Sequence, residues 1–120
     1  MRLKSQQTVL VVEDVDWIRR GMKRNLQRLG YRVVEAADAA EAVESALACP
    51  PDVIVTEEEL PTLGALTESV RGPGPLHGVP VAIINPDEEE GARRGDIIIL
   101  PDFGRIETLM DGARQRSRRH

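Results

Sequence analysis

Residues 8–14 have the sequence TVLVVED, and this stretch indicates the fold class. Thr8–Val12 is a continuous apolar run rich in β-branched residues, which is typical of a strand buried on both faces of a parallel sheet. Glu13 and Asp14 end this run with two acidic side chains. Because α/β proteins gather functional groups at the carboxyl ends of their strands, the stretch predicts a buried strand and a candidate site together.

Further apolar segments follow, spaced so that helices fit between them. After Asp16, which can cap a helix, apolar residues recur at helical spacing, and the alanine-rich residues 38–48 favour a second helix. Strands alternating with helices predict a parallel sheet covered on both faces. The later strands are expected at residues 31–34, 52–56, 80–84 and 96–100, and the later helices at residues 63–70 and 106–113.

The composition suits one soluble domain. The 120 residues fit a single domain over 1–120, with a core over about 8–113 and an arginine-rich tail over 114–120. No apolar run approaches the roughly 20 residues of a membrane helix, and no signal-peptide core follows Met1. With Cys49 as the single cysteine, we expect a cytoplasmic location. The net charge of -4 gives no global attraction to nucleic acid.

Short motifs along the chain share one feature, which is that each ends or flanks an expected strand. They are VVED at 11–14, PDVIV at 51–55 followed by Glu57 and the pair 60–61, VPV at 79–81, and Pro101 with Phe103. In this order and spacing they resemble the receiver domain of bacterial response regulators. The resemblance implies a flavodoxin-like (CheY-like) α/β three-layer sandwich, with a five-stranded parallel sheet in the order 2-1-3-4-5. Since the segment between Asn85 and Leu100 is shorter than usual in that family, we expect a shortened fourth helix.

The resemblance also implies a phosphorylation site, which this chain retains only in part. In the family an aspartate accepts a phosphoryl group from a histidine kinase, two acidic residues hold Mg²⁺, and a Ser or Thr and a Lys bind the phosphoryl oxygens. By position, Glu13 and Asp14 fit the Mg²⁺ pair, Glu57 replaces the aspartate, Asn85 the Ser or Thr, and Leu100 the lysine. Glutamate carries its carboxylate about 1.5 Å further than aspartate, one carbon–carbon bond. Leucine cannot bind a phosphoryl oxygen, so the site is expected to be degenerate.

Three interpretations of this degenerate site stay open. The first is a pseudo-receiver of two-component or phosphorelay signalling that binds proteins without phosphorylation, in which Glu57 accepts a hydrogen bond from Asn85 and mimics the phosphorylated state. The alternatives are a conventional receiver phosphorylated on Glu57 and a small-ligand-binding domain of the same fold. No cofactor is required, although Glu13, Asp14 and Glu57 could hold Mg²⁺. We do not expect an enzyme, because the sequence has no Gly-rich phosphate loop and no Ser/His/Asp set.

Two surfaces are predicted to contact a protein partner. One is the first helix, with its basic face and Trp17, Arg20 and Arg24. The other includes the last strand, with Ile97 and Ile99, where Ile97 falls at the family's switch aromatic. We expect that strand at the edge of the sheet, where pairing with a second copy would give a homodimer.

Overall fold

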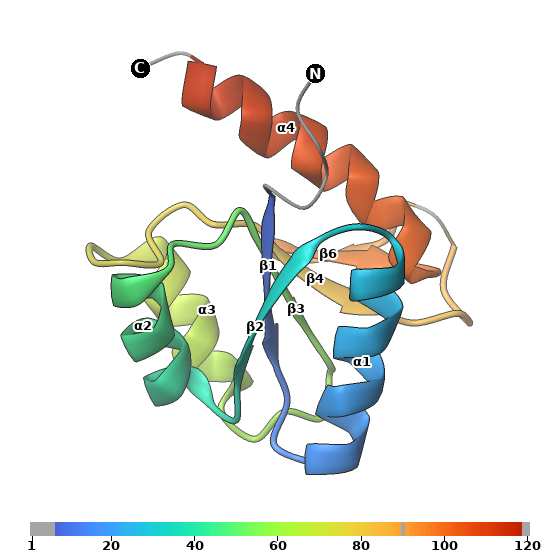
Figure 1. Ribbon diagram of the computed structural model, residues 1–120, viewed down its shortest axis with the longest axis horizontal. Helices are drawn as coiled ribbons and strands as arrows, with labels where there is room; N and C mark the ends of the chain where they lie inside the picture. The colour runs from blue at the N-terminus through green and yellow to red at the C-terminus, as the bar shows by residue number, and fades with distance from the viewer. Residues whose placement is uncertain (1–6, 90, 119–120) are drawn as a thin grey trace.

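A sheet of six strands forms the middle layer of the molecule, in the order β2-β1-β3-β4-β6-β5 (Figure 1). The computed structural model describes residues 7–89 and 91–118, with side chains as far as Gly112. All neighbouring strands are parallel except β5 and β6. The predicted flavodoxin-like class is confirmed, with β6 in the fifth place. The strands are β1 (Thr8–Val12), β2 (Arg32–Ala36), β3 (Val53–Thr56), β4 (Val81–Ile84), β5 (Arg93–Arg94) and β6 (Ile97–Leu100).

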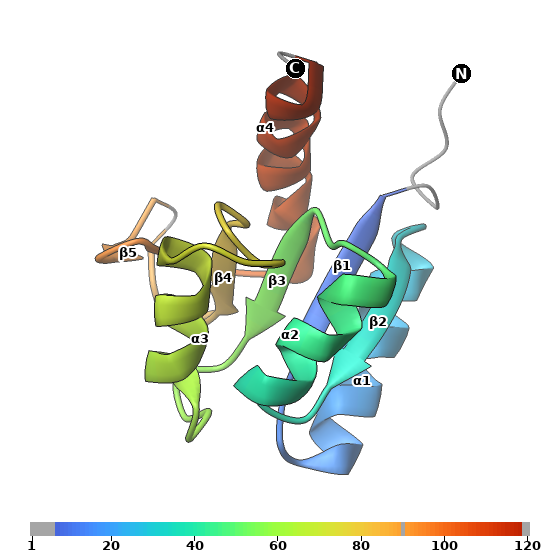
Figure 2. The same cartoon turned by 90° about the vertical axis from the view of Figure 1, so that its left-hand side faces the viewer.

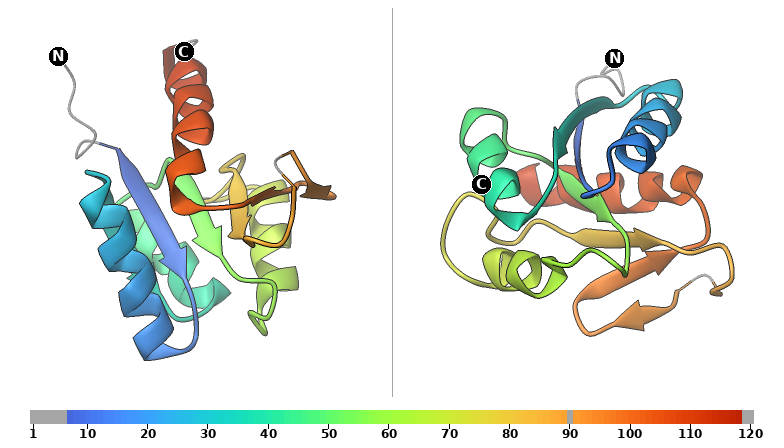
Figure 3. Two further views of the ribbon diagram at one scale, coloured as in Figure 1. Left: turned by 90° about the vertical axis from the view of Figure 1, so that its right-hand side faces the viewer. Right: turned by 90° about the horizontal axis from the view of Figure 1, so that it is seen from below.

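Helices cover both faces of the sheet (Figures 1 and 3). Side chains alternate between the faces along each strand, so Val9 and Val11 of β1 join one core and Leu10 and Val12 the other. The first core includes residues of α1 and α4, and the second includes residues of α2 and α3. The helices are α1 (Asp16–Arg28), α2 (Ala39–Ala48), α3 (Leu63–Arg71) and α4 (Ile106–Arg118), the last preceded by the 3-10 turn η2 (Phe103–Arg105).

The helix starts differ from expectation at one place. Asp38 caps α2 as its type predicts, since its carboxylate accepts the Glu41 N–H at 2.9 Å. Asp16 does not cap α1. The capping position belongs to Val15, and Asp16 lies in the first turn, where its carboxylate pairs with Arg19 at 2.7 Å. A carboxylate in the first turn still faces the positive end of the helix dipole, so it stabilises the same helix end in another way.

The segment between β4 and β6 holds no helix among its described residues, so the predicted shortened fourth helix is wrong. A turn at Asn85 comes first, and the chain then forms β5, which pairs antiparallel with β6 at the outer edge (Figure 2). Gly91 and Gly95 adopt φ values of 93° and 59°, in the left-handed region that interrupts a right-handed helix. Because β5 covers β6, the expectation that β6 forms the sheet edge is also wrong.

The last helix extends further than expected. Helix α4 runs to Arg118 and so takes in most of the segment 114–120 that was expected to be a tail, of which residues 119–120 lie outside the described part. Within the described residues, no helix is both long and apolar enough to cross a membrane.

Candidate functional site

Four strand ends bring the predicted site residues to one edge of the sheet. The parallel register aligns Val11 of β1 with Val55 of β3, Thr56 of β3 with Ile83 of β4, and Ile84 of β4 with Leu100 of β6. The residues that follow these strands therefore emerge side by side. The candidate residues gathered at this edge are Glu13, Asp14, Glu57, Asn85 and Leu100.

Glu13 is a buried carboxyl, with only 2% of its surface exposed. Its Oε2 accepts the Val15 N–H at 2.8 Å, and its side chain also hydrogen-bonds the carboxyl of Glu57. Burial and the bond to Glu57 raise the pKa of Glu13 to about 7. Two carboxyl groups can share a hydrogen bond only when one of them is protonated, so this bond is present below about pH 7, with the proton on Glu13.

The main chain around Glu13 is fixed from both sides. Its N–H donates to the carbonyl oxygen of Ala36, the last residue of β2, at 3.0 Å. Its carbonyl oxygen accepts from Nη1 of Arg19 at 2.8 Å, and Arg19 also pairs with Asp16 and Glu35. Because Arg19 anchors the main chain of Glu13 to α1, the buried carboxyl has a defined position.

The predicted magnesium ligands Glu13, Asp14 and Glu57 lie near one another at the end of the sheet. The side chain of Asp14 is exposed and hydrogen-bonds that of Glu13, so three carboxyls lie close together with Glu57. Their oxygens are of the kind that Mg²⁺ prefers. In the part of the chain that the structure describes, however, no group of three or more His, Cys, Asp or Glu side chains could hold a metal ion. Binding of Mg²⁺ by these residues stays a prediction.

Asn85 does not make the hydrogen bond to Glu57 that was expected. Its Nδ2 donates to Oε1 of Glu58 at 3.4 Å, while its Oδ1 accepts the Asp87 N–H at 3.0 Å. The second bond holds the amide in the turn after β4, and the Glu57 carboxyl is already directed at Glu13. An acidic crevice of about 270 Å³ lies here, lined by Glu57, Glu58, Glu59, Ile83, Ile84 and Asn85.

Arg94 brings a cation to this crevice from a strand that was not predicted. Its Nη1 forms an ion pair with Glu58, and its Nη2 lies 3.6 Å from a carboxylate oxygen of Glu88. One signal could have revealed the hairpin. A Gly-X pair between two strand segments is typical of a two-residue hairpin turn, and Gly95-Asp96 stands between Arg94 and Ile97.

Leu100, which the resemblance assigns to the lysine position, belongs to the apolar interior. Only 6% of its surface is exposed, and it packs in the core shared with α1 and α4. Its carbonyl oxygen accepts the Asn85 N–H at 2.8 Å, which joins the end of β6 to the turn after β4. The side chain offers nothing polar to the crevice.

A groove of about 300 Å³ opens between α1 and the η2 turn, next to Glu57. Trp17 lines it and is 73% exposed, while Phe103 lines it from η2 and is half-buried. Arg20 and Arg24 are exposed on the same helix, and neither forms an ion pair with a described residue. The predicted surface on α1 is therefore exposed.

The predicted surface on β6 is not available to a partner. Ile97 and Ile99 are buried, with 8% and 2% of their surfaces exposed. Helices cover both faces of the sheet and β5 covers the edge of this strand, so naming these two isoleucines as interaction residues was wrong.

No family model matches the chain, but similar proteins and similar solved structures were found. The chain is 36% identical over 58 residues to the transcriptional regulatory protein KdpE of Mycobacterium tuberculosis, a match that covers 48% of this chain and about a quarter (26%) of that protein. It is 30% identical to the receiver domain of the hybrid histidine kinase CckA, with a TM-score of 0.58 and coverage of 90% of this chain and 96% of that one.

A second solved structure is similar over nearly the same extent. The receiver domain of the sensor histidine kinase PA1611 of Pseudomonas aeruginosa PAO1 is 26% identical, with a TM-score of 0.64 and coverage of 88% of this chain and 95% of that one. That structure holds a magnesium ion coordinated in its active-site cleft.

Proposed function

Because this chain belongs to the receiver-domain family of response regulators, we propose that it is a phosphorylation-independent receiver module of two-component signalling that acts by binding another protein. The observation that carries the proposal is the burial of Leu100 where the family has a lysine. Phosphoryl transfer depends on fixed positive charge that neutralises the phosphoryl oxygens. The nearest cation described at the crevice is Arg94, and it is paired with Glu58 and Glu88 rather than with Glu57.

The position of Glu57 also argues against its phosphorylation. Its carboxyl hydrogen-bonds the buried carboxyl of Glu13, and a phosphoryl group on Glu57 would have to displace this contact. Mimicry of the phosphorylated state finds no support from Asn85, whose amide is directed at Glu58. In this proposal the crevice is a structural element of the module, and Mg²⁺ is not required.

The binding surface that we propose is the groove on α1. Exposed aromatic residues beside a concave apolar surface are enriched among the residues that dominate binding energy. Trp17 stands beside such a groove, and Arg20 and Arg24 lie on the same helix. A protein partner that inserts an apolar side chain and presents acidic residues to the arginines would complement this surface. We place the interaction in the cytoplasm and assign no role to nucleic acid or to a homodimer formed through β6.

The first experiment tests whether the crevice responds to phosphoryl chemistry. The chain is titrated with Mg²⁺ and beryllofluoride, and then with acetyl phosphate, while amide resonances are followed by NMR for the wild type and Glu57→Asp. We expect the wild-type resonances at Glu13, Asp14 and Glu57 to stay in place. An adduct on the wild type that Glu57→Gln abolishes would contradict the proposal and favour phosphorylation on Glu57.

The second experiment tests the surface on α1. Partners captured from lysate by the wild type are identified and their affinities are measured with purified proteins. Trp17→Ala should weaken binding at least tenfold, which corresponds to about 1.4 kcal/mol. The matched control is Leu47→Ala on α2, another apolar side chain that is 72% exposed. Equal losses in both variants, or a loss in neither, would contradict the assignment to α1. A small molecule found by native mass spectrometry in the crevice would favour the ligand-binding alternative.

A further inference from the structure

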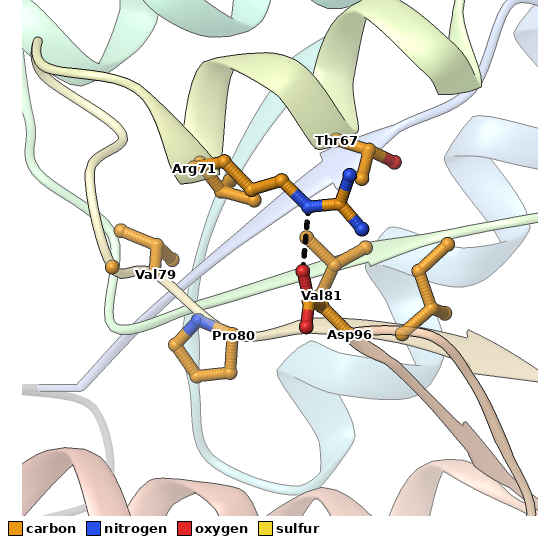
Figure 4. A pocket seen from close by; sticks show the side chains of 9 residues that line it. Thr67, Arg71, Val79, Pro80, Val81 and Asp96 are labelled. Atoms are coloured by element: carbon orange, nitrogen blue, oxygen red, sulfur yellow. Dashed lines mark hydrogen bonds and ion pairs between the residues drawn. The ribbon is translucent and has the colours of Figure 1, made fainter.

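Strands β4 and β6 turn one face toward α3, and β5 pairs with β6 as the edge strand of the sheet (Figure 2). A cavity of about 200 Å³ lies there, with apolar walls from Val70, Val79, Val81 and Ile97. An ion pair spans it, because Nε of Arg71 on α3 lies 2.6 Å from Oδ2 of Asp96, which leads into β6 (Figure 4).

Arg94 reaches across the same face of the sheet. The hairpin register sets Arg94 opposite Ile97 and Arg93 opposite Ile98. Side chains directly opposite in an antiparallel pair lie on the same face. Ile97 packs in the core with α2 and α3, so Arg94 lies on that face, and its guanidinium ends at Glu58 in the loop after β3. In the strand order β4 and β6 lie between β3 and β5, so this pair joins the edge strand to the loop after β3.

Both ion pairs join the β5–β6 hairpin to another segment. Asp96 in the turn pairs with Arg71 of α3, and Arg94 of β5 pairs with Glu58 in the loop after β3. We propose that β5 and the turn after it form a strap, closed by the pairs Arg94–Glu58 and Arg71–Asp96, whose opening exposes the unpaired edge of β6. The strap lies in the segment between β4 and β6, where a shortened helix was expected. It goes beyond the proposed function and is tested on the isolated chain, so its failure would leave that function untouched.

The strap is held weakly, which makes it suited to opening. Both ion pairs are between partly exposed side chains, and such pairs contribute little to stability and are screened by salt. Strand β5 has two residues, and next to it the Ile99 N–H donates to the Ala92 carbonyl oxygen at 2.9 Å. Glu58 is shared between the strap and the acidic crevice, where Asn85 also binds it. A group that binds Glu58 in competition with Arg94 would therefore weaken the strap.

Amide hydrogen exchange tests the strap, with the Ile99 N–H as its reporter. The reference is the Ile54 N–H in the centre of the sheet, which donates to the Pro80 carbonyl oxygen at 2.9 Å. At low salt, Arg94→Gln should speed exchange at Ile99 by about two- to fivefold and leave Ile54 unchanged, as expected for the loss of one exposed pair. Glu58→Gln should act in the same way, and 0.5 M NaCl should reduce the difference between these variants and the wild type.

The matched control is Arg93→Gln, because Arg93 lies on the neighbouring position of β5, faces the other side of the sheet and forms no ion pair with a described residue. It should leave exchange at Ile99 unchanged. The strap is overturned if Arg94→Gln and Arg93→Gln behave alike. It is also overturned if Ile54 accelerates as much as Ile99, because Arg94 would then stabilise the whole fold.

Discussion

Replacing Glu13 by glutamine should remove a large part of the pH dependence of stability. Glutamine keeps the shape of a protonated glutamic acid. Its amide can donate to the Glu57 carboxylate, and its oxygen can accept the Val15 N–H that Glu13 now accepts at 2.8 Å. The variant therefore holds the buried site in the arrangement of the protonated wild type, at every pH. Only the proton equilibrium of residue 13 is lost.

The sign and size of the effect follow from the pKa of Glu13, which rises from 4.5 to about 7 on folding. The folded chain binds this proton more tightly than the unfolded chain, so the resulting stabilisation is complete below pH 4.5 and is lost as the pH rises through 7. At 1.36 kcal/mol for each pKa unit, the whole effect is about 3 kcal/mol. Between pH 5 and 8 the wild type should lose about 2.5 kcal/mol of unfolding free energy through this group.

Urea unfolding at pH 5, 6, 7 and 8 measures this loss. Glu13→Gln should show a much flatter profile than the wild type and should be the more stable of the two at pH 8. Asp14 and Glu57 face the same carboxyl, and Arg19 binds its main-chain oxygen, so the substitution tests the whole cluster. Glu59→Gln, at an exposed carboxylate of the neighbouring loop, should keep the wild-type slope. Parallel profiles for the wild type and Glu13→Gln would refute the reasoning.

Three further substitutions test the packing around the site by urea unfolding at constant pH. Thr56→Val should cost about 1–2 kcal/mol, because the buried Thr56 hydroxyl donates to the Val12 carbonyl oxygen at 2.8 Å; an unchanged midpoint would mean that this bond contributes nothing. Leu66→Ala should cost about 2–5 kcal/mol, since its side chain is fully buried between α3 and the sheet; a cost below 1 kcal/mol would show that the cavity collapses. Trp17→Ala should stay within about 0.5 kcal/mol of the wild type, and a larger cost would show that Trp17 supports the fold rather than a partner surface.

The sequence predicts the central sheet well, because buried strands appear in it as continuous apolar runs. Thr8–Val12 begins and ends where the apolar run does, since a strand buried on both faces has no polar position to blur the pattern. The residues between β4 and β6 contain no such apolar run. A helix was expected there from the family's spacing, although Gly91 and Gly95 disfavour one and Gly95-Asp96 is typical of a tight hairpin.

The sequence identifies which residues meet at the site but not how their side chains pair. Parallel strand ends must lie at one edge, so Glu13, Glu57 and Asn85 were expected together. The acceptor that Asn85 binds depends on the conformation of the loops, and the turn after β4 directs its amide to Glu58. Arg94 was not predicted as a partner, because its placement depends on a strand where the spacing argument had expected a helix.

The charges of the crevice explain why leucine is tolerated at position 100. Crowded carboxylates repel one another unless a cation or a proton intervenes. Here a proton lies between Glu13 and Glu57, and Glu58 is paired with Arg94, so groups of the chain itself offset part of the negative charge. A lysine at position 100 would have to bring an ammonium group into the apolar core around α1 and α4, where desolvation is costly. Leucine instead adds about 1.5–3 kcal/mol of apolar burial. Stability therefore favours leucine wherever phosphoryl binding is no longer selected, which is the condition that the proposed function describes.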